Sequence, residues 1–329
     1  MPANLPPQYF ETEKKLKTAK SYEEKILILE ELLSIVPKHK GTEKLQALLK
    51  TKIAKLKSQT KIKSYIAKHR YGFHLEKAGA GQIVLIGPPN SGKSSLLKSL
   101  TNANPEIGVY PFTTHTPCPG MMHYENIQIQ LIDTPPITVD YMENWHTELI
   151  KYSDAILILL DLANSKAFAD YNTLLVRLKE KRIKTISHEG ESSSDEYSFY
   201  KKALIVANKN DIPDIDEVFA SLKRSIPDEF QPISISALQG NNLENLKKKI
   251  FYALDIVRVY SKTPGKKANL TEPFVLKKGS TPVDMATIVH KDFAKNLKFA
   301  RIWGKNKYQG QKVDRHYMLH DEDIIELHI

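Results

Sequence analysis

The sequence predicts an α/β protein in which a doubly wound, mostly parallel sheet is preceded by a helical N-terminal region and followed by a small α+β domain. Three observations support this prediction. Short aliphatic runs alternate with helical patterns in the middle of the chain, which is typical of a parallel sheet covered on both faces. Apolar residues at helical spacing precede these runs, and four strand-like runs around one helix follow them.

Length, charge and cysteine content indicate a multidomain protein without an internal disulfide or a membrane-spanning segment. The 329 residues suffice for two or three domains, and the net charge of +10 favours a polyanionic partner. The alternative for the charge is a lysine-rich soluble surface. Cys118 is the one cysteine, which excludes an internal disulfide and fits a cytoplasmic location. The longest aliphatic run, 155–160, is too short to cross a membrane, so no membrane partner is expected.

The N-terminal region, residues 1–72, is predicted to be helical and basic. Residues 45, 48, 49, 53 and 56 are apolar at helical spacing, and the other face is rich in lysine. Nine basic residues and no acidic one lie between 44 and 70. A one-signed helix face of this length indicates a surface that contacts phosphates, and the alternative is an ordinary solvated face. The candidates for RNA contact are Lys50, Lys52, Lys55, Lys57, Lys61 and Lys63.

The central domain is predicted to span 73–255. Its strand-like runs are 82–87, 127–133, 155–162, 202–208 and 231–236, and the acidic, serine-rich stretch 188–198 is expected to be a surface excursion.

The C-terminal domain is predicted to span 256–329, with strands near 258–262, 272–279, 298–304 and 324–329. Thr281 offers a helix cap, Pro282 suits the first helical position and Asp284 favours the helix dipole. Two strands, a helix and two further strands give the outline of a β-grasp domain.

A phosphate-binding loop follows the first central strand. The stretch GPPNSGKS satisfies the pattern G-x-x-x-x-G-K-[ST] and opens a helix, which is the context that a P-loop requires. Backbone N–H groups are expected to cradle the α- and β-phosphates, Lys93 to reach the β- and γ-phosphates, and the Ser94 hydroxyl to bind Mg²⁺. The candidates are Gly87, Pro88, Pro89, Asn90, Ser91, Gly92, Lys93, Ser94 and Ser95.

Two further residues are candidates for the metal and the switch. Asp133 ends the strand 127–133, where an acid is expected to hold Mg²⁺ directly or through water. The stretch YPFTTHTP, 110–117, is the candidate first switch, with Thr114 as the Mg²⁺ ligand and Thr113 as the fallback. The alternative is a threonine-rich loop without a metal role.

The stretch NKND, 208–211, predicts recognition of guanine. The Asp211 carboxylate can accept hydrogen bonds from guanine N1 and N2, which adenine does not offer. The Lys209 stem is expected to pack over the base, and Asn208 completes the motif. Ser236, Ala237 and Leu238 follow another strand, where a backbone N–H can contact guanine O6. GTP and GDP are therefore the expected ligands.

Taken together, these residues resemble the Obg-like GTPases of translation, and among them the developmentally regulated GTP-binding proteins. The resemblance covers nearly the whole chain. It implies a Ras-like GTPase domain and a C-terminal TGS domain of β-grasp type that contacts RNA or a protein. It also implies a cytoplasmic GTPase that acts with ribosomes, ribosomal RNA or transfer RNA. It rests on EKLQALLKTKIAKLKSQ, GFHLEKAGAGQIVLIGPPNSGKSSLL, YPFTTHTPCPG, NKND with SAL, VLKKGSTPVDMATIVHKDF, ARIWG and QKVDRHYMLHDEDIIEL.

Two departures from the family pattern bear on the prediction. The family usually has glycine at the position of Glu322, between two acids. In the second switch, Pro136 occupies the place of a glycine whose N–H touches the γ-phosphate, and proline has no N–H. Ile137 stands where Ras-type enzymes have the water-orienting glutamine. Asn90 is a candidate K⁺ ligand by the resemblance, and the alternative is that it only shapes the loop.

The sequence therefore predicts a protein that binds GTP and GDP with modest discrimination, hydrolyses GTP slowly and binds ribosomes or RNA in a nucleotide-dependent way. The alternative is an RNA- or ribosome-binding scaffold, or a stress regulator, that binds GTP with little or no hydrolysis. Pro136 and Ile137 favour the alternative, whereas the otherwise intact phosphate loop and Thr114 favour the enzyme.

Overall fold

The computed structural model describes residues 75–103, 116–139, 142–187, 197–305 and 307–329, together with scattered residues between 12 and 52. Contacts divide the chain into two units, Met1–His74 and Leu75–Ile329. The division into domains at 1–72, 73–255 and 256–329 stays a prediction.

In the first unit, the residues that are described between 28 and 52 are mostly helical. Their apolar side chains bury one another, which is what the helical spacing predicts for an amphipathic segment. Lys50 and Lys52 are exposed, whereas Lys55, Lys57, Lys61 and Lys63 lie outside the described residues. The buried cluster consists of Ile28, Leu29, Leu32, Val36 and Leu49.

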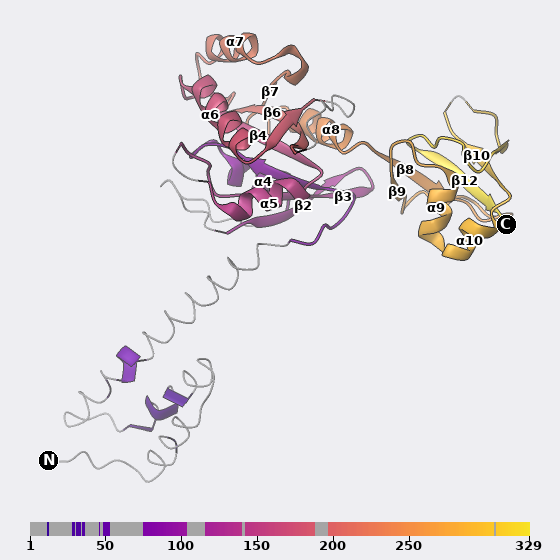
Figure 1. Ribbon diagram of the computed structural model, residues 1–329, viewed down its shortest axis with the longest axis horizontal. Helices are drawn as coiled ribbons and strands as arrows, with labels where there is room; N and C mark the ends of the chain where they lie inside the picture. Colours follow the sequence, from indigo (N-terminus) through magenta and orange to yellow (C-terminus); the bar gives the residue numbers. More distant parts are fainter. Residues whose placement is uncertain are drawn as a thin grey trace. The chain divides into compact units, whose positions relative to one another are not determined.

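The second unit contains a large sheet with strand order β2-β3-β1-β4-β6-β5, in which β7 also pairs with β6 (Figure 1). All pairs are parallel except β2 with β3. This confirms the doubly wound, mostly parallel sheet. The strands are β1 Gln82–Ile86, β2 Cys118–Tyr124, β3 Ile127–Asp133, β4 Ala155–Asp161, β5 Ile183–Ile186, β6 Phe199–Asn208 and β7 Ile233–Ser234. The helices are α4 Lys93–Leu100, α5 Asn144–Tyr152, α6 Ala167–Glu180, α7 Asp216–Ser225, α8 Leu243–Ala253 and the 3₁₀ turn η1 Asp228–Phe230.

The central strands are buried on both faces, so their sequences are continuous aliphatic runs. In β1, the side chains of Ile83 and Leu85 join a core cluster with α4 and α8. Val84 and Ile86 alternate with them and are also fully buried. Because β1 is parallel to β3 and β4, and β4 is parallel to β6, the carboxyl ends of these strands share one edge of the sheet. The predicted phosphate, metal and guanine motifs follow these ends.

The sequence did not predict β2 and β5. The β2 sequence, CPGMMHY, contains proline and glycine, which are depleted in strands. It lies at the edge of the sheet, where a missing N–H donor is tolerated. Strand β5 is only four residues long and pairs with the first part of β6. Both strands are fixed by pairing with a neighbour rather than by their own pattern.

The C-terminal sheet has the order β11-β10-β12-β8-β9, with β12 parallel to β8 and the other pairs antiparallel. The β-grasp outline is confirmed, with one more strand and one more short helix than predicted (Figure 1, orange to yellow). The predicted helix cap is present, because the Thr281 N–H donates to Asp284 Oδ2 at 2.7 Å. The elements are β8 Ile256–Ser261, β9 Phe274–Lys277, α9 Pro282–Val289, α10 Lys291–Asn296, β10 Phe299–Trp303, β11 Gln311–Val313 and β12 Asp323–His328. No helix in the described part of the chain is long and apolar enough to span a membrane.

Glu322 occupies a left-handed backbone conformation, with φ of 67°. This is a conformation that glycine adopts without strain and that other residues adopt at a cost. The Glu322 carboxylate accepts hydrogen bonds from Lys305 at 2.8 Å and from Arg258 at 3.3 Å. These contacts offset part of the strain at the turn that precedes β12.

The strain predicts a difference between two substitutions of Glu322. Glycine and alanine both remove the carboxylate, but only glycine also relieves the left-handed conformation. We expect the Glu322→Gly protein to be more stable than the Glu322→Ala protein by about 1 kcal/mol. Urea unfolding of the two full-length variants measures the difference. Equal stabilities would contradict strain at this position.

Candidate nucleotide-binding site

The phosphate loop connects β1 to α4, and its backbone conformation requires particular residues. Gly92 has φ of 91°, and a Cβ at this position would collide with the side-chain amide of Asn208. Asn90 also adopts a left-handed conformation, with φ of 59°, and its side chain is exposed. The loop thus turns sharply between the strand and the helix, so that the first N–H groups of α4 face the space above the loop.

Lys93 lies against the loop itself. Its ammonium group donates to the carbonyl oxygens of Gly87 at 3.2 Å and Pro88 at 3.0 Å. The side chain is 6% exposed, and burial lowers its pKa to about 8, while the Asp133 carboxylate acts in the opposite direction. A buried ammonium held by neutral carbonyls gains strongly from a nearby anion, which is what a phosphate supplies.

Ser94 near the start of α4 contacts Asp133, the last residue of β3. Leu85 of β1 lies beside Asp133, and the Ser94 hydroxyl donates to Asp133 Oδ2 at 2.5 Å. Asp133 is fully buried, its Oδ1 has no hydrogen-bond partner, and burial raises its pKa. A hydroxyl beside a carboxylate with an unpaired oxygen is a donor set that fits Mg²⁺, which also takes water and phosphate oxygens.

Asn208, at the end of β6, ties two loops together. Its amide Nδ2 donates to the carbonyl of Ser91 at 2.9 Å, and its Oδ1 accepts from the N–H of Ala237 at 2.9 Å. The side chain is buried. It therefore holds the phosphate loop and the loop 236–238 in fixed relation. The sequence suggested Asn208 through the NKND motif but did not predict these partners.

Lys209 and Asp211, the other predicted guanine-binding residues of NKND, do not contact the phosphate loop as Asn208 does. Lys209 has φ of 72°, and its ammonium group lies 2.6 Å from Asp161 Oδ2 at the end of β4. Asp211 Oδ1 is buried without a hydrogen-bond partner. Leu238 is 84% exposed at the neighbouring loop, while Ser236 is fully buried. An unpaired carboxylate oxygen on one loop and an exposed apolar side chain on the neighbouring loop suit a planar base that carries N–H donors.

The second switch begins in a packed conformation. The Thr134 hydroxyl donates to the Leu85 carbonyl at 2.7 Å, and the Ile137 N–H donates to the Gly87 carbonyl at 3.1 Å. Pro136 and Ile137 are both buried. The first N–H after Pro136 is therefore already bonded to the phosphate loop, which the sequence did not predict.

Two of the predicted switch residues, Thr113 and Thr114, lie outside the described residues, as does most of the acidic stretch 188–198. Conversely, the structure draws attention to a residue that sequence analysis missed. His146 on α5 is 1% exposed, and neither ring nitrogen has a hydrogen-bond partner. A histidine inside an otherwise amphipathic helix, NWHTELIKY, is the only sequence signal that could have identified it.

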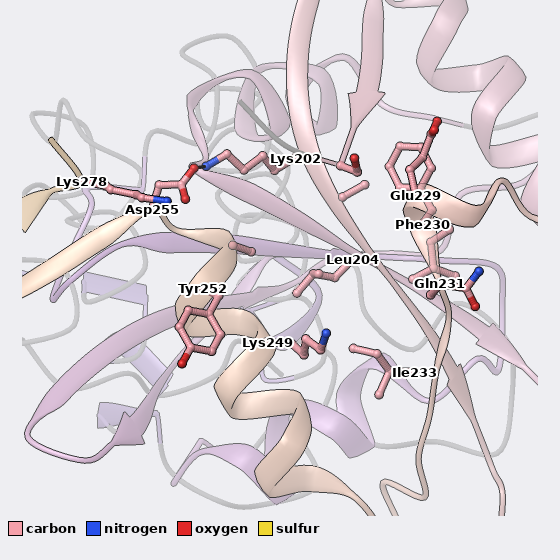
Figure 2. Close-up of a pocket in the computed structure, with 14 residues that line it drawn as sticks. Lys202, Leu204, Glu229, Phe230, Gln231, Ile233, Lys249, Tyr252, Asp255 and Lys278 are labelled. Atoms are coloured by element: carbon pink, nitrogen blue, oxygen red, sulfur yellow. Dashed lines mark hydrogen bonds and ion pairs between the residues drawn. The ribbon is translucent and has the colours of Figure 1, made fainter. Parts of the chain in front are cut away.

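A separate pocket of about 670 Å³ lies beside β6 (Figure 2). It opens where the edge of β6 passes from β5, paired at Lys202, to β7, paired at Val206. Lys202 forms an ion pair with Asp255, and Tyr252 and Lys249 approach from α8. The pocket is lined by residues 202–205 in the middle of β6, whereas NKND begins at Asn208, the last residue of that strand, so the pocket shares no residue with the predicted nucleotide loops.

The fold and this constellation define a P-loop protein that binds guanine nucleotides. The sequence model of the family described as "50S ribosome-binding GTPase" matches residues 82–209, and that of the TGS domain matches 257–329. The chain belongs to the family of developmentally regulated GTP-binding proteins, because its similarity to members of that family covers more than nine-tenths of its length.

Three relatives illustrate this similarity. An uncharacterized GTP-binding protein of Methanocaldococcus jannaschii is 31% identical and covers 93% of this chain and 92% of its own. Developmentally regulated G-protein 1 of Arabidopsis thaliana is 29% identical, and the match covers 92% of this chain and 90% of that protein. Developmentally regulated GTP-binding protein 2 of Homo sapiens is 26% identical, covering 92% and 98%.

Solved structures also resemble the chain. A GTP-binding protein from Pyrococcus horikoshii OT3 has a TM-score of 0.49 at 17% identity, covering 75% of this chain and 99% of that one. Era in complex with MgGDPNP and nucleotides 1506–1542 of 16S ribosomal RNA has a TM-score of 0.41 at 20% identity, covering 68% and 70%.

Proposed function

We propose that this protein hydrolyses GTP slowly and that its nucleotide state controls its binding to ribosomes or structured RNA. Two buried carboxylate oxygens carry the proposal, Asp133 Oδ1 and Asp211 Oδ1. Buried polar atoms almost always have a hydrogen-bond partner. Two buried oxygens without one therefore indicate a ligand that supplies the partners. They lie at the places where the sequence predicts Mg²⁺ and guanine.

The chain's own residues divide the work of binding. N–H groups of the phosphate loop contact the α- and β-phosphates, and Lys93 exchanges the carbonyls of Gly87 and Pro88 for phosphate oxygens. Ser94 and Asp133 hold Mg²⁺, which neutralises charge on the phosphate oxygens when bound. Thr114 of the first switch is the third proposed protein ligand, and Asp211 selects guanine.

The second switch supports slow rather than fast turnover. Pro136 cannot donate to the γ-phosphate, and the Ile137 N–H is bonded to Gly87. Loss of a charge-assisted hydrogen bond lowers the preference for GTP by about 1.5–3 kcal/mol. Asn90, whose exposed side chain stands at the phosphate loop, is the proposed K⁺ ligand, and K⁺ would add positive charge in the transition state.

GTP turnover in K⁺ and in Na⁺ buffer, with and without ribosomes, tests the proposal beside a Pro136→Gly variant. We expect slow turnover that rises with K⁺ or with ribosomes. We also expect the glycine variant to prefer GTP over GDP about tenfold more strongly than the wild type, because it regains an N–H donor.

Two outcomes would contradict this proposal. A strong preference of the isolated wild-type protein for GTP over GDP would show that Pro136 does not restrain the switch. Turnover that is absent from the wild type and recovered in the glycine variant would identify a scaffold or regulator that binds GTP without hydrolysing it. The packed Ile137 N–H is the observation that favours this second function.

RNA binding is proposed from the basic N-terminal region, with the TGS domain as a second contact to RNA or to a protein. The exposed Lys50 and Lys52 agree with such a surface. We expect retention on ribosomes or RNA to fall steeply with salt, and to drop when several lysines from Lys50 to Lys63 are neutralised together. Unchanged retention of that variant in a sedimentation assay would exclude the helix as the contact.

A further inference from the structure

The pocket beside β6 arises from a gap in the large sheet. The outer edge of β6 pairs with β5 as far as Lys202 and with β7 from Val206 onward. Between these two ladders, no strand of the described chain is in register with residues 203–205 on that side. Leu204 is therefore only half-buried, and it lines a cavity of about 670 Å³. Sites for small organic ligands commonly have volumes of about 300–1,000 Å³, so this cavity has room for one nucleotide unit.

The interior of the pocket is largely apolar. Leu204 lies between α8, which carries Tyr252, and the segment that carries Phe230 and Ile233 (Figure 2). Phe230 and Ile233 are buried, and together with Leu204 they give the pocket an apolar lining. A lining of this kind favours a ligand with a flat or apolar body, which loses its contact with water there.

The charges around the pocket have a different distribution. Lys202 forms an ion pair with Asp255, and its side chain is 8% exposed, so these two charges largely cancel. Lys249 and Lys278 are exposed and line the same pocket, against one exposed acid, Glu229. The rim thus carries an excess of positive charge around an apolar interior. A nucleotide matches this arrangement, because its base is a flat ring and its phosphate is an anion.

An exposed aromatic ring stands beside these lysines. Tyr252 is 59% exposed, and its ring centroid lies 5.6 Å from that of Phe251. Lys248 and Lys277, next to two of the lining lysines in the chain, are exposed as well. Proteins that bind single-stranded nucleic acids combine positive charge along the backbone with aromatic rings on which bases stack. An acidic peptide would match the lysines alone, whereas a nucleotide also uses the ring and the apolar interior.

We propose that this pocket binds an unpaired nucleotide of RNA. The base enters the apolar interior beside Leu204 or stacks on Tyr252, and Lys249 and Lys278 attract the flanking phosphates. The nucleotide must be unpaired, because a base inside a duplex does not expose its face. This inference rests on the proposed function, since it adds a contact on the GTPase domain for the RNA that the protein is proposed to bind.

Binding of a fluorescent 12-nucleotide oligouridine to the full chain, followed by anisotropy, tests the role of the ring. Oligouridine contains no guanine, and excess GDP with Mg²⁺ keeps the predicted guanine site occupied. We expect Tyr252→Ala to bind about tenfold more weakly than the wild type, because a stacking surface is lost. Tyr252→Phe keeps the ring and is expected to bind within about twofold of the wild type. Thermal unfolding shows whether each variant folds.

The dependence of the same binding on salt tests the lysines. For single strands, each phosphate contact adds about 0.7 to the slope of log affinity against log salt concentration. The double variant Lys249→Gln with Lys278→Gln is therefore expected to lower this slope by about 1.4. The matched control is Lys223→Gln with Arg224→Gln, which removes the same charge from exposed positions on α7 and is expected to leave the slope unchanged.

The outcomes separate this inference from the proposed function. A wild-type protein that binds neither oligouridine nor ribosomes would contradict the proposed RNA binding itself. Binding to ribosomes without binding to oligouridine would overturn only the pocket, as would oligouridine binding that Tyr252→Ala leaves unchanged. Displacement of oligouridine by equally low concentrations of uridine monophosphate would assign the pocket to a free nucleotide, and would also overturn the proposal.

Discussion

Replacing Asp211 with asparagine is expected to lower the affinity for GTP by about two to four orders of magnitude. The Asp211 carboxylate has a buried oxygen without a partner, and guanine N1–H and N2–H are the donors that match it. Asparagine offers at most one acceptor oxygen and brings an N–H group toward the guanine amino group. Two charge-assisted hydrogen bonds are lost, at about 1.5–3 kcal/mol each.

Competition binding with GTP, ATP and xanthosine triphosphate measures this change. Xanthine carries a carbonyl in place of the guanine amino group, so the asparagine amide can donate to it, and xanthosine triphosphate is expected to gain affinity in the variant. Asp214→Asn is the matched control. Asp214 is exposed in the same loop with φ of 61°, a conformation that asparagine adopts readily. Unchanged GTP binding by Asp211→Asn would show that Asp211 does not contact the base.

Replacing Lys93 with methionine is expected to weaken binding of GTP and GDP by about 10²–10³-fold, because the ammonium group is the proposed partner of the phosphates. The nucleotide-free protein is expected to be at least as stable as the wild type. In that state the ammonium is buried, its pKa is lowered to about 8, and neutral carbonyls are its main partners. Methionine has a similar length and carries no charge to bury.

Nucleotide titration and thermal unfolding of the same Lys93→Met preparation check both parts of this prediction. Lys98→Met is the control, since Lys98 is exposed on the same helix and is not part of the loop. A Lys93→Met protein that binds nucleotides normally would remove Lys93 from the phosphate site. A large loss of stability would instead show that its bonds to Gly87 and Pro88 support the loop.

Local patterns predicted much of the fold. The predicted strand-like runs became β1, β3, β4, β6 and β7. In β1 and β4 the aliphatic run is continuous, because these central strands are buried on both faces. Thr281, Pro282 and Asp284 started α9 because a helix N-terminus needs a cap and tolerates proline. Strands β2, β5 and β11 were missed, since each is short or lies at a sheet edge and owes its conformation to a partner.

The phosphate loop, the NKND stretch and the β-grasp outline were predictable from local spacing, because in each the signal lies in residues that are near one another in the chain. Contacts between groups that are distant in the chain depend on the fold. The Asn208 side chain donates to the Ser91 carbonyl, and the Ile137 N–H donates to the Gly87 carbonyl. These pairs form because parallel strands bring their carboxyl ends to one edge of the sheet, and no local pattern records which side chains gather there.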